Sequence, residues 1–235
     1  MNRNILTLFF LLMCIHVFAQ NIECKYTSTT VIPEDVKNIE DANIRNIVIN
    51  QLSNKKKTFS LKVSNGKYLF EAISNEQNNG TVMQIGGSSS IYMDMNTKTS
   101  ISQENILDRT FLIKETVKTY DWNITTENKE IINKKCTKAT LKENPTIVAW
   151  FTSEIPVSFG PMGYYGLPGL ILQLETPSKN YIIQEISVSK ENISIKAPDK
   201  GKEISREDFD ALKKKKQESL GINKGNGSKV KIIKM

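Results

Sequence analysis

Apolar and polar residues alternate with a period of two along most of this chain, and turn residues separate the alternating runs. This pattern predicts short β-strands with one face toward a core and the other toward water. Asn65-Gly66 between two such runs is typical of a hairpin with a type I′ turn, because that turn needs positive φ twice. The predicted strands cover residues 22–30, 59–63, 68–73, 90–95, 110–115, 120–125, 134–141, 146–152, 170–175, 181–189 and 192–196.

Strands of this length and spacing predict a mainly β fold, an antiparallel meander that forms a curved sheet or a partial barrel. Residues 41–52 fit a short helix or a polar connection, and the sequence does not separate the two. A C-terminal helix is indicated after Ser205, where a cap hydroxyl and the acidic Asp208 resemble a capping box. Phe209 gives this helix an apolar contact, and Gly221 can end it.

The first residues differ from the rest, since residues 5–18 form an apolar run behind the single positive charge of Arg3. The run is about 14 residues long, short of the roughly 20 that a helix needs to cross a bilayer. It predicts a secretory signal peptide that is cleaved after Ala19. Cys14 would suit a lipoprotein only behind a small residue, and a methionine precedes it.

This interpretation predicts an exported protein, in the periplasm, associated with an outer membrane or secreted. Loss of Arg3 would lower the formal net charge from +7 for the whole chain to +6. No later segment approaches the length of a transmembrane helix. The predicted organisation is a signal peptide over 1–19, a β-rich domain over 20–200, a helix over 201–221 and a basic tail over 222–235.

The one histidine of the chain, His16, lies inside the predicted signal peptide. A mature protein without histidine has no Ser-His-Asp triad, no Cys-His pair and no imidazole ligand for zinc. Cys24 and Cys136 are too few for a thiolate zinc site, so we expect no metal and no cofactor. In an exported protein they are compatible with a disulfide, while the lysines beside Cys136 are compatible with a reactive thiolate.

The segment 144–175 stands out because four glycines and several aromatic residues interrupt the alternation. Residues 167–170, Leu-Pro-Gly-Leu, fit a type II turn with positive φ at Gly169. Aromatic rings on glycine-flanked backbone favour a ligand platform, although the same rings can instead cover the end of a β core. The candidate binding residues are Trp150 as a floor, Tyr164 and Tyr165 at a rim, and Leu167 and Pro168 in the turn.

Several short strings of this region occur together in one known family. They are Trp122-Asn123-Ile124, Cys136 to Thr140, Ala149 to Thr152, Glu154-Ile155-Pro156, Gly160-Pro161 and the hexapeptide Gly166 to Ile171. The chain thereby resembles the GLPGLI family of exported proteins from Bacteroidota. The resemblance implies export and a β-rich scaffold, and the family carries no agreed activity or catalytic residue to transfer.

Two classes of function remain open. The first is a binding or assembly module for a peptide, an apolar ligand or an outer-membrane partner. The second is a hydrolase of an envelope or extracellular polymer that would need two carboxylates at about 5 or 6.5–9.5 Å. The candidate carboxylates are Asp121, Glu130, Glu154 and Glu175.

Lysines gather at one further place, the run Lys213 to Lys216 on the predicted C-terminal helix. The run suits weak contact with an anionic surface, although the acidic residues 207, 208, 210 and 218 dilute its charge. Nucleic acid is not an expected partner, because the other basic residues are scattered and no binding motif is present.

Overall fold

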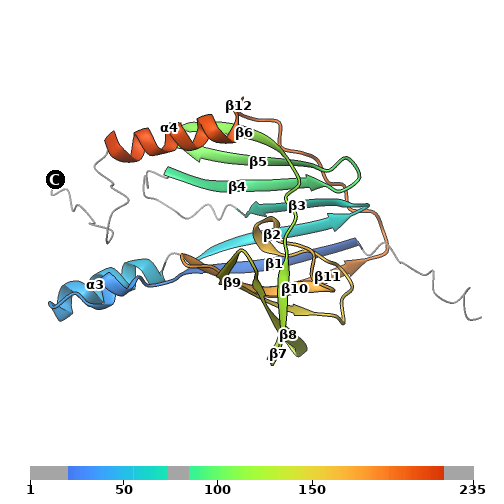
Figure 1. Cartoon of the computed structure of the whole chain (residues 1–235), viewed down its shortest axis with the longest axis horizontal. Helices are drawn as coiled ribbons and strands as arrows, with labels where there is room; N and C mark the ends of the chain where they lie inside the picture. The colour runs from blue at the N-terminus through green and yellow to red at the C-terminus, as the bar shows by residue number, and fades with distance from the viewer. Residues whose placement is uncertain (1–20, 55, 74–84, 220–235) are drawn as a thin grey trace, which may run out of the picture.

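A single β-sheet of 12 strands forms the body of the protein in the computed structural model, which describes residues 21–54, 56–73 and 85–219 (Figure 1). The strand order is β12-β6-β5-β4-β3-β2-β1-β11-β10-β9-β8-β7. Neighbouring strands are antiparallel except for β12, which pairs in parallel with β6. The predicted mainly β class with a C-terminal helix is therefore confirmed, and β12 makes the sheet a mixed one.

The sheet consists of two meanders that meet where β1 pairs with β11. The first meander contains β1 (Asn21–Thr30), β2 (Lys57–Ser64), β3 (Lys67–Ala72), β4 (Ile85–Asp94), β5 (Thr99–Ile106) and β6 (Arg109–Thr116). The second contains β7 (Trp122–Ile131), β8 (Lys134–Leu141), β9 (Asn144–Thr152), β10 (Leu170–Glu175) and β11 (Lys179–Ser189). The remaining elements are α2 (Glu34–Lys37), α3 (Ala42–Ser53), η1 (Pro161–Gly163), β12 (Lys202–Glu203) and α4 (Arg206–Ser219).

The connection 117–121 shows why the sheet must curl. It joins β6 to β7, which lie ten strand positions apart in the sheet order. In a flat sheet these strands would be about 48 Å apart, since neighbouring strands are about 4.8 Å apart. Six residue steps span at most about 21 Å. The sheet therefore bends back on itself, and Figure 1 shows the first meander nearly horizontal with the 117–121 connection crossing it.

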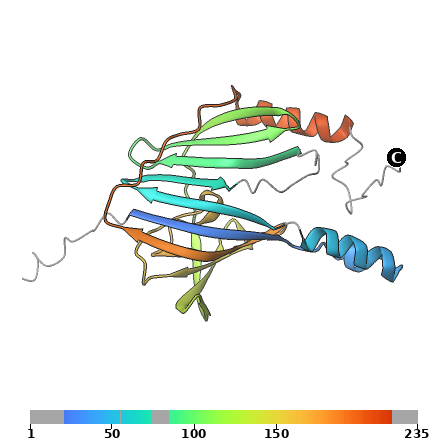
Figure 2. The same cartoon turned by 180° about the vertical axis from the view of Figure 1, so that it is seen from behind.

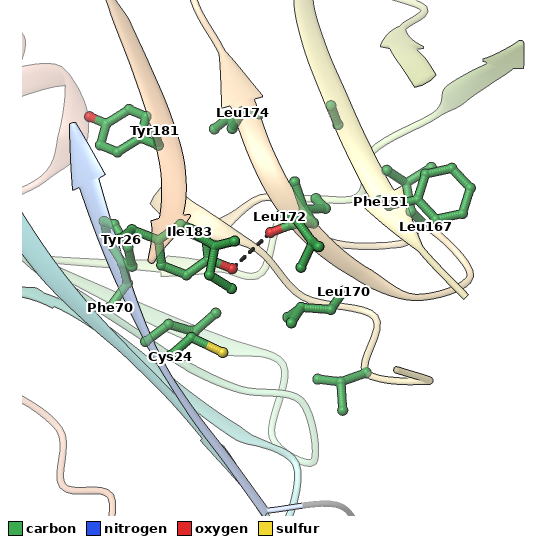
Figure 3. Packing of buried hydrophobic residues seen from close by; sticks show 14 of the residues in the cluster. Cys24, Tyr26, Phe70, Phe151, Leu167, Leu170, Leu172, Leu174, Tyr181 and Ile183 are labelled. Atoms are coloured by element: carbon green, nitrogen blue, oxygen red, sulfur yellow. Dashed lines mark hydrogen bonds between the residues drawn. The ribbon is translucent and has the colours of Figure 1, made fainter. Parts of the chain in front are cut away.

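The main hydrophobic core fills the inside of this bend. β10 lies deep within it, because Leu170, Leu172 and Leu174 are fully buried. Figure 3 shows these leucines near Tyr26 of β1 and Tyr181 of β11. The Tyr26 hydroxyl donates a hydrogen bond of 2.7 Å to the carbonyl of Ile171, which satisfies a polar group in an otherwise apolar region.

A second, small cluster holds the C-terminal helix. Phe209 of α4 is fully buried against Ile106, Phe111 and Ile113 of β5 and β6. The predicted cap is present, since the amide of Asp208 donates to the Ser205 hydroxyl at 3.0 Å. The start of α4 is thus fixed to the inner face of the first meander.

The structure confirms some local predictions and corrects others. The hairpin turn is as expected, with φ of 52° at Asn65 and 74° at Gly66. Residues 42–53 are helical, and the Asp41 carboxylate caps that helix by accepting from two backbone amides. The strand predicted at 192–196 is wrong, because these residues have no regular structure. β5 was not predicted at all. The signal peptide, Gly221 and the basic tail lie outside the described residues.

Candidate functional site

The glycine-rich chain between β9 and β10 folds back on itself. The Ser158 hydroxyl donates to the carbonyl of Leu167 at 2.7 Å and accepts from the amide of Gly166 at 3.1 Å. Leu167 is buried and Pro168 is exposed, so the first anchors the segment in the core and the second faces solvent. These two predicted site residues therefore have different surroundings.

The turn at 167–170 is tighter than the predicted type II turn. The amide of Gly169 donates to the carbonyl of Leu167 at 2.8 Å, whereas the amide of Leu170 donates to Ile155 at 3.0 Å. A type II turn would instead bond residue 170 back to residue 167. The predicted positive φ at Gly169 is present, at 151°. The correction thus concerns the hydrogen bonding of the turn.

Tyr68 of β3 holds the glycine-rich segment through two hydrogen bonds. Its buried hydroxyl donates to the carbonyl of Gly160 at 2.8 Å and accepts from the amide of Gly163 at 2.8 Å. Burial is the largest influence on this hydroxyl and raises its pKa, so it stays protonated and remains a donor. No sequence pattern indicates this role, because Tyr68 occupies an ordinary core position of its strand.

Tyr164 and Tyr165 belong to an aromatic cluster with Tyr120 and Trp122, which precede or begin β7. The Tyr120 ring lies 4.8 Å from Tyr164 and 5.7 Å from Tyr165, measured between centroids. The Trp122 indole donates to the carbonyl of Tyr165 at 2.9 Å. Both tyrosines are half-buried. The aromatic cluster, defined by these four residues, therefore joins the 117–121 connection to the glycine-rich segment.

Trp150, the predicted floor, makes other contacts. Its indole donates to the Glu175 carboxylate at 3.0 Å, and the ammonium of Lys129 lies 4.0 Å from its ring centroid. Lys129 also donates to Gln173 at 2.7 Å. Burial lowers the pKa of Lys129, partly offset by Glu175. Trp150 thus belongs to a polar network on β7, β9 and β10, and the structure does not bring it to the tyrosines.

A groove of about 240 Å³ borders the aromatic cluster on the inner face of the first meander. Tyr120 and Met162 line it beside the aromatic cluster, and Arg206 at the start of α4 lines it as well. The floor comes from β4, β5 and β6. The lining residues are Ile91, Met93, Ser100, Ser102, Glu104, Glu115, Thr116, Lys118, Tyr120, Met162, Gly163 and Arg206.

Arg206 connects two acidic side chains of the groove. Its guanidinium donates to Glu104 at 2.8 Å and to Glu115 at 2.9 Å. Burial lowers the pKa of Arg206, but its hydrogen bonds to Glu115 and Glu104 outweigh that effect and raise it overall. Lys118 is paired with Glu143 at 2.8 Å. Each ionic group of the groove therefore already has a partner of opposite charge before any ligand enters.

Two other hollows, of about 320 and 300 Å³, lie beside the segment 190–200 on the first meander. Their linings include exposed residues of that segment, and they contain no aromatic side chain. The groove at Arg206 combines aromatic, apolar and paired charged groups. We therefore take it as the candidate site.

The candidate catalytic carboxylates do not form a free acid-base pair. Glu154 accepts from Lys134 at 2.8 Å and from the amide of Lys135, and these bonds lower its pKa. Glu175 accepts from Trp150 at 3.0 Å. Asp121 and Glu130 lie at opposite ends of the β7 region, nine residues apart, or about 30 Å along a strand.

The two cysteines are free thiols, so the structure does not contain the disulfide that the sequence allowed. Cys24 on β1 and Cys136 on β8 are four strand positions apart, or about 19 Å along the sheet. Burial raises the pKa of Cys136 to about 11, although Lys129 acts in the other direction. This raised pKa disfavours the reactive thiolate with which the neighbouring lysines were compatible. Among the described residues, no cluster of potential metal ligands occurs.

Lys213 to Lys216 lie on the second half of α4, where the last three are exposed. In the ranges that the structure describes, no helix has both the length and the apolar character to cross a lipid bilayer. The fold and groove define a mainly β protein with a small groove of paired charged groups beside an aromatic cluster.

One family model matches this chain, and the match includes the glycine-rich segment between β9 and β10. Residues 141–173 match a family model described as "Protein of unknown function (Porph_ging)". The match covers β9, the glycine-rich segment and most of β10. No curated protein matches the chain.

Solved structures resemble the fold. Two structures of PNGF-II, in space groups P21 and C2, are 15% and 14% identical to this chain, each with a TM-score of 0.51. The likeness covers 85% of this chain and 34% of the PNGF-II chain, so it spans about a third of that protein and concerns the fold alone. An uncharacterized conserved protein from Thermus thermophilus is 6% identical, with a TM-score of 0.40 over 85% of this chain and 99% of its own.

Proposed function

We propose that this protein is an exported, non-catalytic binding module and that the groove at Arg206 is its ligand site. The observation that carries the proposal is the pairing of Arg206 with both Glu104 and Glu115, beside the Tyr120 ring. A binding site of this kind presents fixed donors and acceptors together with an apolar wall, which sets the orientation of a ligand.

The same pairing argues against the hydrolase alternative. A general acid in glycoside cleavage needs a carboxyl group that keeps its proton near neutral pH. The Glu104 and Glu115 carboxylates are instead both bonded to the Arg206 guanidinium. Hydrogen bonds from Lys134 and from the amide of Lys135 lower the pKa of Glu154.

The groove's chemistry suits a small, neutral, hydroxyl-rich ligand with one apolar face, such as a single saccharide unit. Hydroxyl groups donate to carboxylates and accept from a guanidinium, so they can use both Glu104 and Arg206 without adding charge. The Tyr120 ring and Met162 offer an apolar wall for the other face. A volume of about 240 Å³ is below the usual range for drug-sized ligands, so one ring is the matching size.

Two further parts of the proposal rest on the sequence. Export rests on the apolar run 5–18 behind Arg3 and the small residue Ala19. Membership of the GLPGLI family rests on the hexapeptide Gly166 to Ile171, which lies inside the segment matched by the family model of unknown function.

The ligand site is tested by calorimetric titration of the protein with a panel of neutral mono- and disaccharides and of uncharged tetrapeptides. We expect at least one saccharide to bind. Tyr120→Ala should remove that binding because the ring forms one wall, and Tyr120→Phe should keep it. Thr116→Trp should also remove it, because a large side chain at this exposed rim position fills the groove.

Trp150→Ala is the matched control, since it removes an aromatic residue from a different network. It should leave the affinity unchanged. Binding of tetrapeptides alone would contradict the ligand class, and saccharide binding that survives both Tyr120→Ala and Thr116→Trp in folded protein would contradict the site.

A further inference from the structure

Helix α3 presents an apolar stripe that the protein does not cover. Ile44, Ile47, Val48 and Leu52 follow the i, i+3, i+4, i+8 spacing of one helix face. No residue of α3 is buried, and Ile44 and Ile47 are 49% and 56% exposed. Figures 1 and 2 show the helix projecting beyond the end of the sheet. Such a stripe normally packs against a partner, because packing supplies most of the stability of a helix in a protein.

Basic residues follow the C-terminal end of this helix, where Lys56 precedes β2 and Lys57 begins it. Residues 42–57 contain no acidic residue, and Arg45 lies at the other end of α3, in its first turn. Lys179 lies at the same place, since it pairs with the last residue of β1. Burial lowers the pKa of Lys179 and the charge of Lys57 lowers it further. Positive charge is therefore concentrated where α3 leaves the sheet. The acidic residues that precede α3 are Glu34, Asp35, Glu40 and Asp41. Glu34 is paired with Lys37, and Asp41 caps α3 at the end away from β2.

The second half of α4 reaches the same end of the molecule. β1, β3 and β5 run in one direction, as alternate strands of an antiparallel meander. Arg206 contacts Glu104 and Phe209 contacts Ile106, so α4 runs toward the end of β5. Lys213 to Lys216 follow, with Glu218 as the one acidic residue after them in the helix. Both views show α3 and the end of α4 projecting from the same side (Figures 1 and 2).

We propose that this end of the protein, formed by α3, Lys56, Lys57, Lys179 and residues 212–219, docks on the surface of a bilayer that contains anionic lipid. An apolar helix face with basic flanks matches the interface between acyl chains and negatively charged headgroups. Several lysines near such a surface add to the attraction. The proposal is independent of the groove and its ligand.

A second copy of the chain fits this end less well. A helix of 12 residues is about 18 Å long, which is short for an interface that should bury at least about 1,000 Å². Two copies meeting through α3 would also bring their lysine clusters together. Like charges at an interface oppose association. An anionic surface is attracted by the same charges that would keep two copies apart.

The test is sedimentation with vesicles of phosphatidylcholine, with or without phosphatidylglycerol. The protein should begin at Gln20, because the apolar run 5–18 would itself bind lipid, and all 12 strands lie after that residue. We expect binding only to the vesicles with phosphatidylglycerol, and loss of binding at high salt. Ile44→Ser with Ile47→Ser, and separately Lys213 to Lys216→Gln, should each lower the partition coefficient by at least about tenfold.

Matched controls exist for both variants. Ile124 and Val188 are 49% and 59% exposed on β7 and β11, so Ile124→Ser with Val188→Ser removes similar apolar area elsewhere. Lys190, Lys196, Lys200 and Lys202 are exposed outside this end, and changing all four to Gln removes the same charge as the α4 variant. Both controls should bind as the unchanged protein does.

Several results would overturn the proposal. The protein could stay in the supernatant with both kinds of vesicle, or the control variants could lose as much binding as the test variants. A concentration-dependent dimer in light scattering that Ile44→Ser with Ile47→Ser abolishes, without lipid binding, would assign this end to a second copy instead. Circular dichroism of each variant establishes that a loss is not due to unfolding.

Discussion

Gly169 offers the sharpest test of the turn that leads into β10. Its φ of 151° lies where residues with a side chain are rarely found. A β-carbon at this position would lie 2.6 Å from the carbonyl carbon of Thr152, which is backbone of the neighbouring strand. Because a backbone atom cannot rotate away as a side chain can, Gly169→Ala must shift the start of β10 or the end of β9.

Two costs add in this variant. The unfavourable φ costs about 1–3 kcal/mol, and crowding in a packed region costs about 1–3 kcal/mol. We expect the free energy of unfolding to fall by about 3–5 kcal/mol. At a urea slope of about 3 kcal/mol/M, suitable for a domain of this size, the midpoint should fall by more than about 1 M.

Gly166→Ala separates the two costs, because its φ is also positive, at 97°, while its nearest atom would be 3.7 Å away. This variant should lose only the conformational part, about 1–2 kcal/mol. Urea denaturation followed by tryptophan fluorescence measures both variants. Equal midpoints for the two would refute the contact with Thr152, and an unchanged midpoint for Gly169→Ala would refute the turn itself.

Other predictions follow from the same structure. Phe209→Ala should release α4 from the sheet at a cost of about 3 kcal/mol, seen as faster amide exchange over 206–219; unchanged exchange would contradict the second cluster. Folding raises the pKa of Cys136 to about 11 and of Cys24 to about 12 from the ordinary 9.0. The stability that the protonated thiols contribute should therefore be complete below pH 9 and lost between pH 9 and about 12. In Cys24→Ala the urea midpoint should decline less steeply over this pH range. Rapid labelling of either thiol in native protein at pH 8 would count against this. Tyr164→Ala with Tyr165→Ala should lower the free energy of unfolding by about 2–3 kcal/mol, since both rings are half-buried. The double variant should also weaken saccharide binding, because the Tyr120 ring loses its support. A variant as stable as the parent would show that the rings do not pack as described.

Sequence patterns predicted the elements whose inward positions are apolar. Phe59, Leu61 and Val63 alternate inward on β2, and Asn65-Gly66 fixed the turn that follows. β5 was not predicted, because some of its inward positions are polar. Its inward positions include Ser102 and Glu104, so it lacks the apolar alternation that marks a strand. These polar positions form the floor of the groove, and a functional site is where a local rule is expected to fail.

The residues predicted for a site meet the proposed groove only indirectly. Tyr164 and Tyr165 were singled out by their glycine neighbours, and they contact Tyr120, which lines the groove, without lining it themselves. Tyr120 and Arg206 were missed, because they join the site from the 117–121 connection and from α4, far away along the chain. Trp150 was placed wrongly, since the alternation of β9 left open which of its two faces meets the glycine-rich segment.

The methionines of the groove at Arg206 report directly on whether this groove holds the ligand. Met93 and Met162 line the groove, whereas Met95 packs on the core outside it. In protein with ¹³C-labelled methionine methyl groups, a bound saccharide should shift the signals of Met93 and Met162 in proportion to occupancy and leave that of Met95 unchanged. Saturating ligand that shifts neither Met93 nor Met162 would contradict the account.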